Sequence, residues 1–191
     1  MNLPRLTGNF VSRWLVVTLA LSIATAIEGG HLAHWLSLSP HDIFRGQVWR
    51  LATWPLVETG PLELIFTCAA IYKFGGDLAA QWGDRRLRRF AIDVTLFAAV
   101  ATCIVSLLSP IPVFRLGGWA ITDALVIAWA RQFPARPLRI YELFHLHGRD
   151  LALFTLGVAA LFAVFYGPIA VAPELAACAI AFFYPKRRLR T

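Results

Sequence analysis

With 191 residues, of which 58% are hydrophobic and only 15% charged, the chain has too little charge to cover the surface of a soluble domain. Its mean hydropathy of +0.63 favours the lipid bilayer as its solvent. We interpret the formal net charge of +7 as a membrane-topology signal, so we expect the bilayer rather than a nucleic acid as its partner.

Six apolar stretches follow one another along the chain, and a membrane span needs roughly 20 mostly apolar residues. They cover residues 12–30, 61–81, 90–109, 117–133, 151–167 and 169–184. We therefore predict an all-α membrane protein with six transmembrane helices in one polytopic domain, residues 1–191. Between the first two stretches, residues 31–60 are predicted to form an outer loop lying in the membrane interface, and residues 185–191 to form a basic cytoplasmic tail.

Basic residues are distributed unevenly between the two sides that these stretches define. Of 18 Lys and Arg residues, Arg45, Arg50 and Arg115 fall on one side and Lys73 lies inside the second stretch. The remaining 14 lie on the side of both termini, which the positive-inside rule places in the cytoplasm. The short, arginine-rich chain favours a prokaryotic plasma (inner) membrane.

Four segments carry a resemblance to a known family. "FGGDLAAQWGDRRLRRF" at 74–90 resembles the end of the second rhomboid helix, and "RGQVWRLATWPLV" at 45–57 resembles the luminal loop of rhomboids and derlins. "ARQFPARPLRIYELFHLHGRDLALF" at 130–154 is similar to the family's passage from the fourth to the fifth helix, and "APELAACAIAFFYPKRRLR" at 172–190 to its last helix. The resemblance covers roughly residues 40–190 and implies a six-helix rhomboid-like bundle.

The resemblance also places the rhomboid catalytic positions, and this chain departs at each of them. The nucleophile of the Gly-x-Ser-Gly tetrad falls on Trp119 and the general base on Glu174, while the two oxyanion-stabilising positions fall on Glu63 and Thr67. An indole is no nucleophile, and a carboxylate at an oxyanion position repels the charge that it should stabilise. We therefore predict a rhomboid pseudoprotease, similar to derlins, without peptidase activity.

Such a protein is expected to bind transmembrane clients or partners, helped by local thinning of the bilayer around a short fourth helix. Glu63, Asp123 and Glu174 are expected to line a polar cavity whose nucleophile pocket Trp119 fills. Three readings remain open. The acids are protonated or hydrogen-bonded structural groups, they pass protons or cations, or an unrecognised site makes the chain an active rhomboid peptidase.

The remaining candidate residues are structural. By resemblance, Trp49 and Arg50 anchor the outer loop, with the Trp buried and the Arg bonding loop carbonyls. Lys73 and Asp77 have the spacing of an ion pair within one helix. Close helix packing is assigned to Gly75, Gly76, Gly83, Gly117, Gly118, Ala177 and Ala181. The three cysteines lack the spacing of a disulfide or metal site, and we predict neither a metal nor a cofactor.

Overall fold

The computed structural model describes residues 9–107, 114–134, 136–140, 144–167 and 171–184. The elements, in chain order, are α1 (Asn9–Glu28), α2 (His31–Leu36), α3 (Pro40–Phe44), α4 (Arg50–Thr53), the 3₁₀ turn η1 (Trp54–Leu56), α5 (Pro61–Ala70), the π turn η2 (Ile71–Gly75), α6 (Gly76–Trp82), α7 (Asp84–Leu107), α8 (Trp119–Gln132), β1 (Pro137–Ile140), β2 (Phe144–His147), α9 (Gly148–Tyr166) and α10 (Ala172–Phe183).

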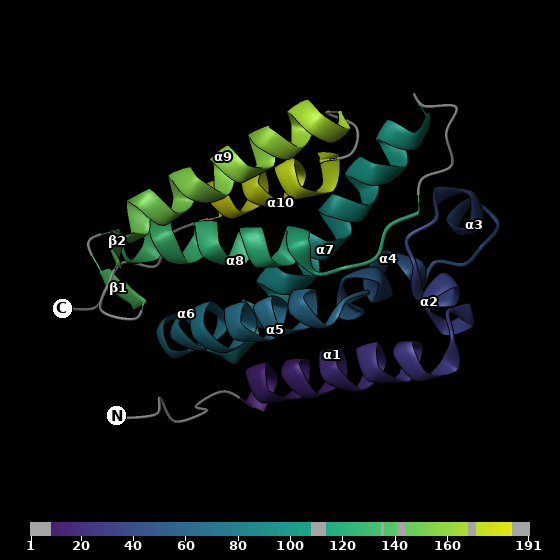
Figure 1. Cartoon of the computed structure of the whole chain (residues 1–191), viewed down its shortest axis with the longest axis horizontal. Coiled ribbons are helices and arrows are strands. Elements are labelled where there is room, and N and C mark those ends of the chain that lie inside the picture. Colours follow the sequence, from purple (N-terminus) through teal and green to yellow (C-terminus); the bar gives the residue numbers. More distant parts are fainter. Residues whose placement is uncertain (1–8, 108–113, 135, 141–143, 168–170, 185–191) are drawn as a thin grey trace.

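The long helices lie side by side and alternate in direction (Figure 1). At one end, the Phe10 backbone N–H at the start of α1 donates to Asp84 Oδ2 at the start of α7, over 3.1 Å. At the same end, Trp82 of α6 donates to Gln132 of α8 over 3.2 Å and stacks on Tyr184, the residue after α10. Because α1 and α7 begin where α6, α8 and α10 end, successive long segments run in opposite directions.

Within the described residues, three helices are long and apolar enough to cross a membrane: Phe10–Glu28, Asp84–Leu107 and Gly148–Tyr166. Helix α10, with 12 residues, is apolar but shorter, and α8 has 14 residues. The elements α5, η2 and α6 follow one another without a break, because the backbone at both junctions is right-handed helical. The prediction of a helical membrane bundle is confirmed at this level.

A short hairpin departs from the all-helical prediction. Strands β1 and β2 pair antiparallel, with Pro137 opposite His147, where we predicted only a loop. The hairpin leads directly into α9, whose N-cap is His147, and Asp150 Oδ2 accepts the His147 backbone N–H over 3.1 Å. The hairpin sits at the end of the bundle opposite α2 and α3 (Figure 1).

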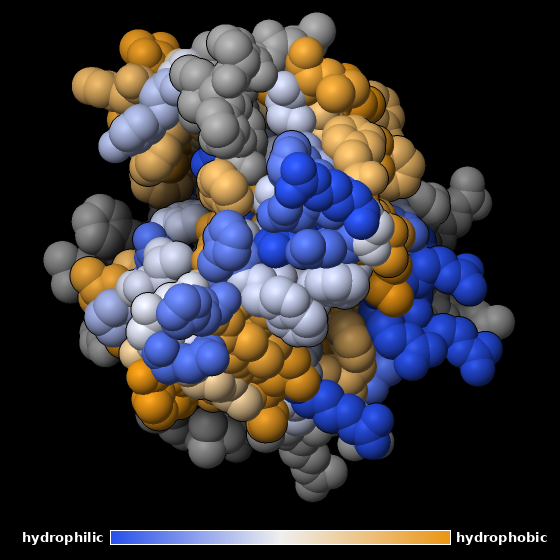
Figure 2. All heavy atoms as spheres, turned by 90° about the vertical axis from the view of Figure 1, so that its right-hand side faces the viewer, coloured by the Kyte–Doolittle hydropathy of each residue, from blue (hydrophilic) through white to orange (hydrophobic). Residues whose placement is uncertain are grey.

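The predicted outer loop folds into α2, α3, α4 and η1 and ties back to the chain before α8. Leu38 and Arg115 exchange two backbone hydrogen bonds, of 2.8 and 3.0 Å. Figure 2 views this end of the molecule face on and shows hydrophilic side chains across its centre, with hydrophobic residues at its flanks. That pattern is typical of a polar end that emerges from an apolar belt.

Helix α8 lies at the centre of the bundle, and every residue from Ala124 to Ala130 is buried. Helices α9 and α10 flank it in Figure 1. By contrast, α9 exposes much of its apolar surface, including Leu153, Phe154 and Val164. A soluble protein rarely exposes so much contiguous apolar surface, whereas a helix facing lipid does.

Small residues have roles other than those predicted. A Cβ on Gly75 would meet only Ile71 of its own helical segment, and a Cβ on Gly76 would meet nothing within 4 Å, so neither brings helices together. Gly83 has φ +85° and ends α6 in a backbone conformation that favours glycine. Only Ala177 and Ala181 match the prediction, since both are fully buried on α10.

One close helix contact was missed by the sequence analysis. A Cβ on Gly148, the first residue of α9, would lie 2.7 Å from the carbonyl oxygen of Phe133, which follows α8. The absent side chain lets α9 begin directly against the end of α8. The predicted Lys73–Asp77 pair is confirmed at 3.4 Å, and Trp129 of α8 also donates to Asp77, over 2.9 Å.

Candidate functional site

A cavity of about 300 Å³ lies between α5, α8, α9 and α10. It brings together four of the predicted site residues, Glu63, Trp119, Asp123 and Glu174. The other side chains that line it are Arg115, Val158, Ala159, Phe162, Tyr166 and Val171. We call this space the acidic cavity, because its wall combines three carboxyl groups and one guanidinium with aliphatic and aromatic groups.

The local structure explains how two of these carboxyl groups are tolerated. Glu63 and Glu174 lie in the first turns of α5 and α10, where backbone N–H groups and the helix dipole favour negative charge. Glu63 also accepts a hydrogen bond from Thr59 Oγ1 over 2.8 Å. Glu174 Oε2 is buried and has no hydrogen-bond partner among the described residues.

We predicted that Trp119 fills the nucleophile pocket, and the structure does not place it there. Its side chain is 46% exposed and forms part of the wall of the acidic cavity. Asp123, one turn further along α8, lines the same cavity because residues four apart share a helix face. The cavity is therefore open at the position that the rhomboid resemblance assigns to the nucleophile.

The place next to that position is occupied instead by Glu58, a residue that sequence reasoning missed. Glu58 follows η1 and is only 4% exposed. Its Oε1 atom accepts two hydrogen bonds of 2.7 Å, from Thr67 Oγ1 and from the backbone N–H of Gly118, the N-cap residue of α8. Its own backbone N–H donates to Ser22 Oγ of α1 over 3.0 Å. We call these four residues the Glu58 network.

Thr67 thus belongs to the Glu58 network and not to the acidic cavity. Gly117 and Gly118 also have their explanation here. A Cβ on Gly118 would lie 2.7 Å from Glu58 Oε1 and 3.0 Å from Thr67 Cγ2. Gly117, at φ +116°, turns the chain so that it can enter α8, and a Cβ there would lie 3.3 Å from Glu58 Oε2. Both glycines make room for the Glu58 carboxylate, and Gly118 also lets the start of α8 approach Thr67 of α5.

The electrostatics of Glu58 combine two opposing effects. Burial raises the pKa of the Glu58 carboxyl above its ordinary value, while the hydrogen bonds from Thr67 and the Gly118 N–H favour the ionised form. A carboxylate at the N-terminus of α8 also satisfies a backbone donor that a helix leaves without an internal partner. The Glu58 network therefore ties the loop, α5 and α1 to the first turn of α8.

Among the described residues, no hydroxyl group is hydrogen-bonded to a histidine ring. Ser37 Oγ donates instead to the backbone carbonyl of His34, over 2.7 Å. Acyl transfer needs a hydroxyl activated by a base and donors for the oxyanion. What the acidic cavity can do is hold a polar or cationic group beside apolar and aromatic surface.

Of the two predicted loop anchors, Arg50 matches the prediction and Trp49 does not. Arg50 is 2% exposed and donates to the carbonyl oxygens of His34 and Ser37, the latter over 2.8 Å, and to Gln47 Oε1 over 2.7 Å. Trp49, predicted to be buried, is 37% exposed and packs against Trp35 with ring centroids 5.1 Å apart and the ring planes tilted by 37°.

The buried indole of the loop belongs instead to Trp54, which is 3% exposed. Arg50 also pairs with Asp42 at 3.4 Å. The pKa of Asp42 is lowered mainly by a hydrogen bond from Ser39; burial opposes this shift, and the charge of Arg50 adds to it. The loop is therefore held by charge-assisted hydrogen bonds that converge on one guanidinium.

The chain matches the model of a known protein family. The sequence model of the family described as "Eukaryotic integral membrane protein (DUF1751)" matches residues 9–186. The description confirms the prediction of an integral membrane protein, and it shows that our prediction of a prokaryotic plasma membrane was wrong. An excess of arginine on one side records membrane orientation and carries no information about the organism. Because the match spans nearly the whole chain, the chain belongs to this family of eukaryotic integral membrane proteins.

Proposed function

We propose that this chain is a six-span, rhomboid-like membrane protein without peptidase activity, which binds a transmembrane segment of a partner protein at the acidic cavity. The observation that carries the proposal is the cavity itself. It combines three carboxyl groups and Arg115 with Trp119, Phe162 and Tyr166, all within a helical membrane protein.

The count of six spans rests on the alternating helices. Three of the six are the long helices α1, α7 and α9. The fourth is the continuous helical segment 61–82, formed by the 22 residues of α5, η2 and α6, and the other two are the short helices α8 and α10. Arg85, Arg131 and Arg136 lie at the end of the bundle where α7 begins and α8 ends. The positive-inside rule then supports a cytoplasmic location for this end and for both termini.

The walls of the acidic cavity support lateral access by a membrane segment. On α9, Phe162 and Tyr166 line the cavity and are also exposed, so they face both the cavity and the surroundings of the bundle. On α5, Leu62, Ile65 and Phe66 are exposed beside Glu63. A transmembrane helix with a polar or basic residue would bury that residue against the carboxyl groups and its apolar face against α9.

The short helices support a thinned bilayer around the bundle. Helix α10, with 12 residues, is about 18 Å long, which is less than the roughly 30 Å of the hydrocarbon core, and it exposes Leu175, Phe182 and Phe183 at the surface of the bundle. Matching lipid to such a helix costs fractions of a kcal/mol per Å. A thinner bilayer lowers the cost of admitting a partner segment that itself carries polar groups.

Site-specific photocrosslinking in native membranes tests the proposal. A photoreactive residue at Phe162 should capture membrane proteins, whereas one at Val164, which is exposed but lies about 200° further around α9, should capture far fewer. Replacing Glu63, Asp123 and Glu174 by their amides should reduce capture at position 162. Equal capture at positions 162 and 164, or capture unchanged by the three amides, would contradict client binding at the acidic cavity.

The three carboxyl groups in one cavity also favour a second function, the passage of protons or cations. Proteoliposomes decide between the two. Transport is supported if the wild-type protein conducts protons or cations and the variants Asp123→Asn and Glu174→Gln do not. A wild-type flux equal to that of empty vesicles would exclude transport. Covalent labelling by a fluorophosphonate probe would restore the third alternative, an active serine peptidase.

A further inference from the structure

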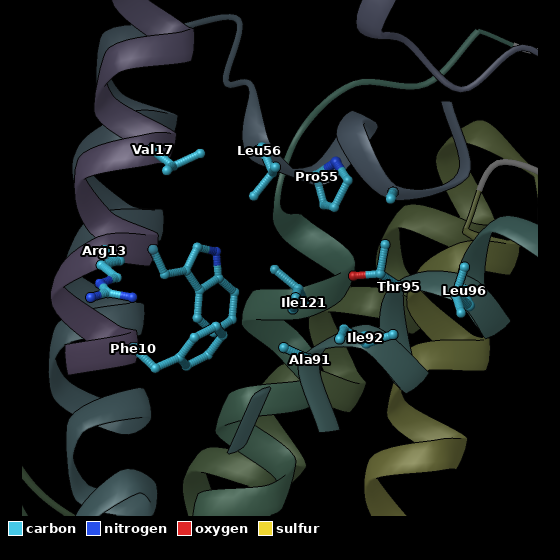
Figure 3. A pocket seen from close by; sticks show the side chains of 12 residues that line it. Phe10, Arg13, Val17, Pro55, Leu56, Ala91, Ile92, Thr95, Leu96 and Ile121 are labelled. Atoms are coloured by element: carbon cyan, nitrogen blue, oxygen red, sulfur yellow. The ribbon is translucent and has the colours of Figure 1, made fainter. Parts of the chain in front are cut away.

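A second cavity, of about 390 Å³, lies between α1, the η1 turn and α7 (Figure 3). We call it the apolar groove, since its wall is almost wholly apolar and it is open on one side. Phe10 and Trp14 of α1, Ala91 and Ile92 of α7, and Pro55 and Leu56 of η1 are among the residues that line it. Figure 3 shows Pro55 and Leu56 across one end of the space and Phe10 and Ala91 toward the other.

The dimensions of the apolar groove point to the class of its occupant. From Phe10 to Val17, the groove extends about 10 Å along the axis of α1. That is shorter than one leaflet, whose hydrocarbon is roughly 15 Å thick. Because η1 closes the groove at its far end, a transmembrane helix of full length cannot run through it. A lipid acyl chain, which ends at the middle of the bilayer, can.

Two exposed arginines belong to the helices on either side of the groove, α1 and α7. Arg13 of α1 lines it and is exposed, and Arg88 of α7 is exposed and lies four residues before Ile92, on the same helix face. Neither takes part in an ion pair among the described residues. No acidic side chain lines the groove, and the nearby Asp84 accepts the backbone N–H of Phe10.

We propose that the apolar groove binds one anionic phospholipid, with an acyl chain between α1 and α7 and the headgroup phosphate at Arg13 and Arg88. Guanidinium groups bind phosphate with charge-assisted, often bidentate hydrogen bonds. The arginine-rich end of the bundle faces the leaflet in which anionic lipids attract basic residues. The site is separate from the acidic cavity and does not depend on client binding there; only the orientation of the arginine-rich end is taken from the proposed function.

Native mass spectrometry of the full chain, released from detergent with added lipid, tests this assignment. Phosphatidylglycerol should bind more tightly than phosphatidylcholine with the same acyl chains. Two arginines near a membrane surface, at about 1 kcal/mol each, correspond to a preference of about 30-fold. The variant Arg13→Ala/Arg88→Ala should lose this preference, whereas Arg13→Lys/Arg88→Lys should retain most of it.

Matched controls separate a specific site from general attraction. The variant Arg45→Ala/Arg149→Ala removes the same charge away from the groove and should keep the preference. Ile92→Trp should fill the groove and displace the lipid, whereas Ile104→Trp, on another face of α7, should not. Equal binding of the two lipids, an equal loss in the control pair, or full binding by Ile92→Trp would overturn the proposal. If the double alanine variant does not fold, the two tryptophan variants carry the test.

Discussion

Replacing Gly118 by Ala should destabilise the protein chiefly because of Glu58 Oε1, the atom nearest to the new Cβ. The new Cβ would lie 2.7 Å from that oxygen, 3.0 Å from Thr67 Cγ2 and 3.3 Å from the carbonyl oxygen of Pro55. Overpacking a rigid site costs about 1–3 kcal/mol. Displacing the carboxylate also weakens its charge-assisted bond to the Gly118 N–H, a bond worth about 1.5–3 kcal/mol. We therefore expect Gly118→Ala to lower the free energy of unfolding by about 3–5 kcal/mol.

A double-mutant cycle isolates the contribution of Glu58. On its own, Glu58→Ala should cost about 2–5 kcal/mol, because it leaves Thr67 Oγ1 and the Gly118 N–H without their acceptor. In that background the contact with Glu58 Oε1 is gone and only those with Thr67 Cγ2 and the Pro55 carbonyl oxygen remain, so the further cost of Gly118→Ala should fall to about 1 kcal/mol. Denaturant unfolding in mixed detergent micelles measures all four proteins.

Gly76→Ala is the matched control, since no atom lies within 4 Å of its would-be Cβ. In the middle of a helix this change should be neutral or stabilise by up to about 1 kcal/mol. The reasoning is refuted if Gly118→Ala costs the same with and without Glu58, because the carboxylate then does not determine the need for glycine.

Three further predictions concern the loop and the helix contacts. Arg50→Ala should lower the free energy of unfolding by about 3–5 kcal/mol, because it leaves buried carbonyl groups without a donor. Trp49→Ala should lower it by less than about 1 kcal/mol. Thermal unfolding in detergent compares the two variants. Asp42 has a lowered pKa, so its contribution is complete above its ordinary pKa of 3.8 and is lost as the pH falls through the lowered value. The stability difference between wild type and Asp42→Asn should therefore shrink below pH 3.8, and a constant difference would contradict the ion pair with Arg50. Gly148→Ala should cost about 1–3 kcal/mol against the end of α8, while Gly157→Ala, with nothing within 4 Å, should not lower the melting temperature.

The helices could be predicted from the sequence because the bilayer imposes length and hydropathy on each of them. The predicted stretch 61–81 corresponds to the helical segment 61–82, and 117–133 to α8. Helix α7 begins six residues earlier than predicted, at Asp84, because its first turns carry four arginines and have no apolar signal. The pairing of β1 with β2 was missed, although it joins residues close in sequence.

The sequence predicted the residues of the acidic cavity but not the Glu58 network. Glu63, Asp123 and Glu174 are charges inside apolar stretches, and such charges are costly enough to be informative. Glu58 lies outside any periodic pattern, in a loop where an acid is ordinary. Its burial depends on Gly118 and Thr67, which are distant in sequence, so no local signal reveals it.

The π turn at residues 71–75 has a consequence for the two halves of the second long segment. A π turn holds one residue more than an α turn, so it rotates everything before it by roughly 100° relative to everything after it. Thr67 therefore faces Glu58 while Asp77 faces Trp129, although the two residues belong to one continuous rod. Deleting a single residue from this turn would restore α-helical winding. The segment could then keep either the Thr67–Glu58 or the Asp77–Trp129 hydrogen bond, but not both.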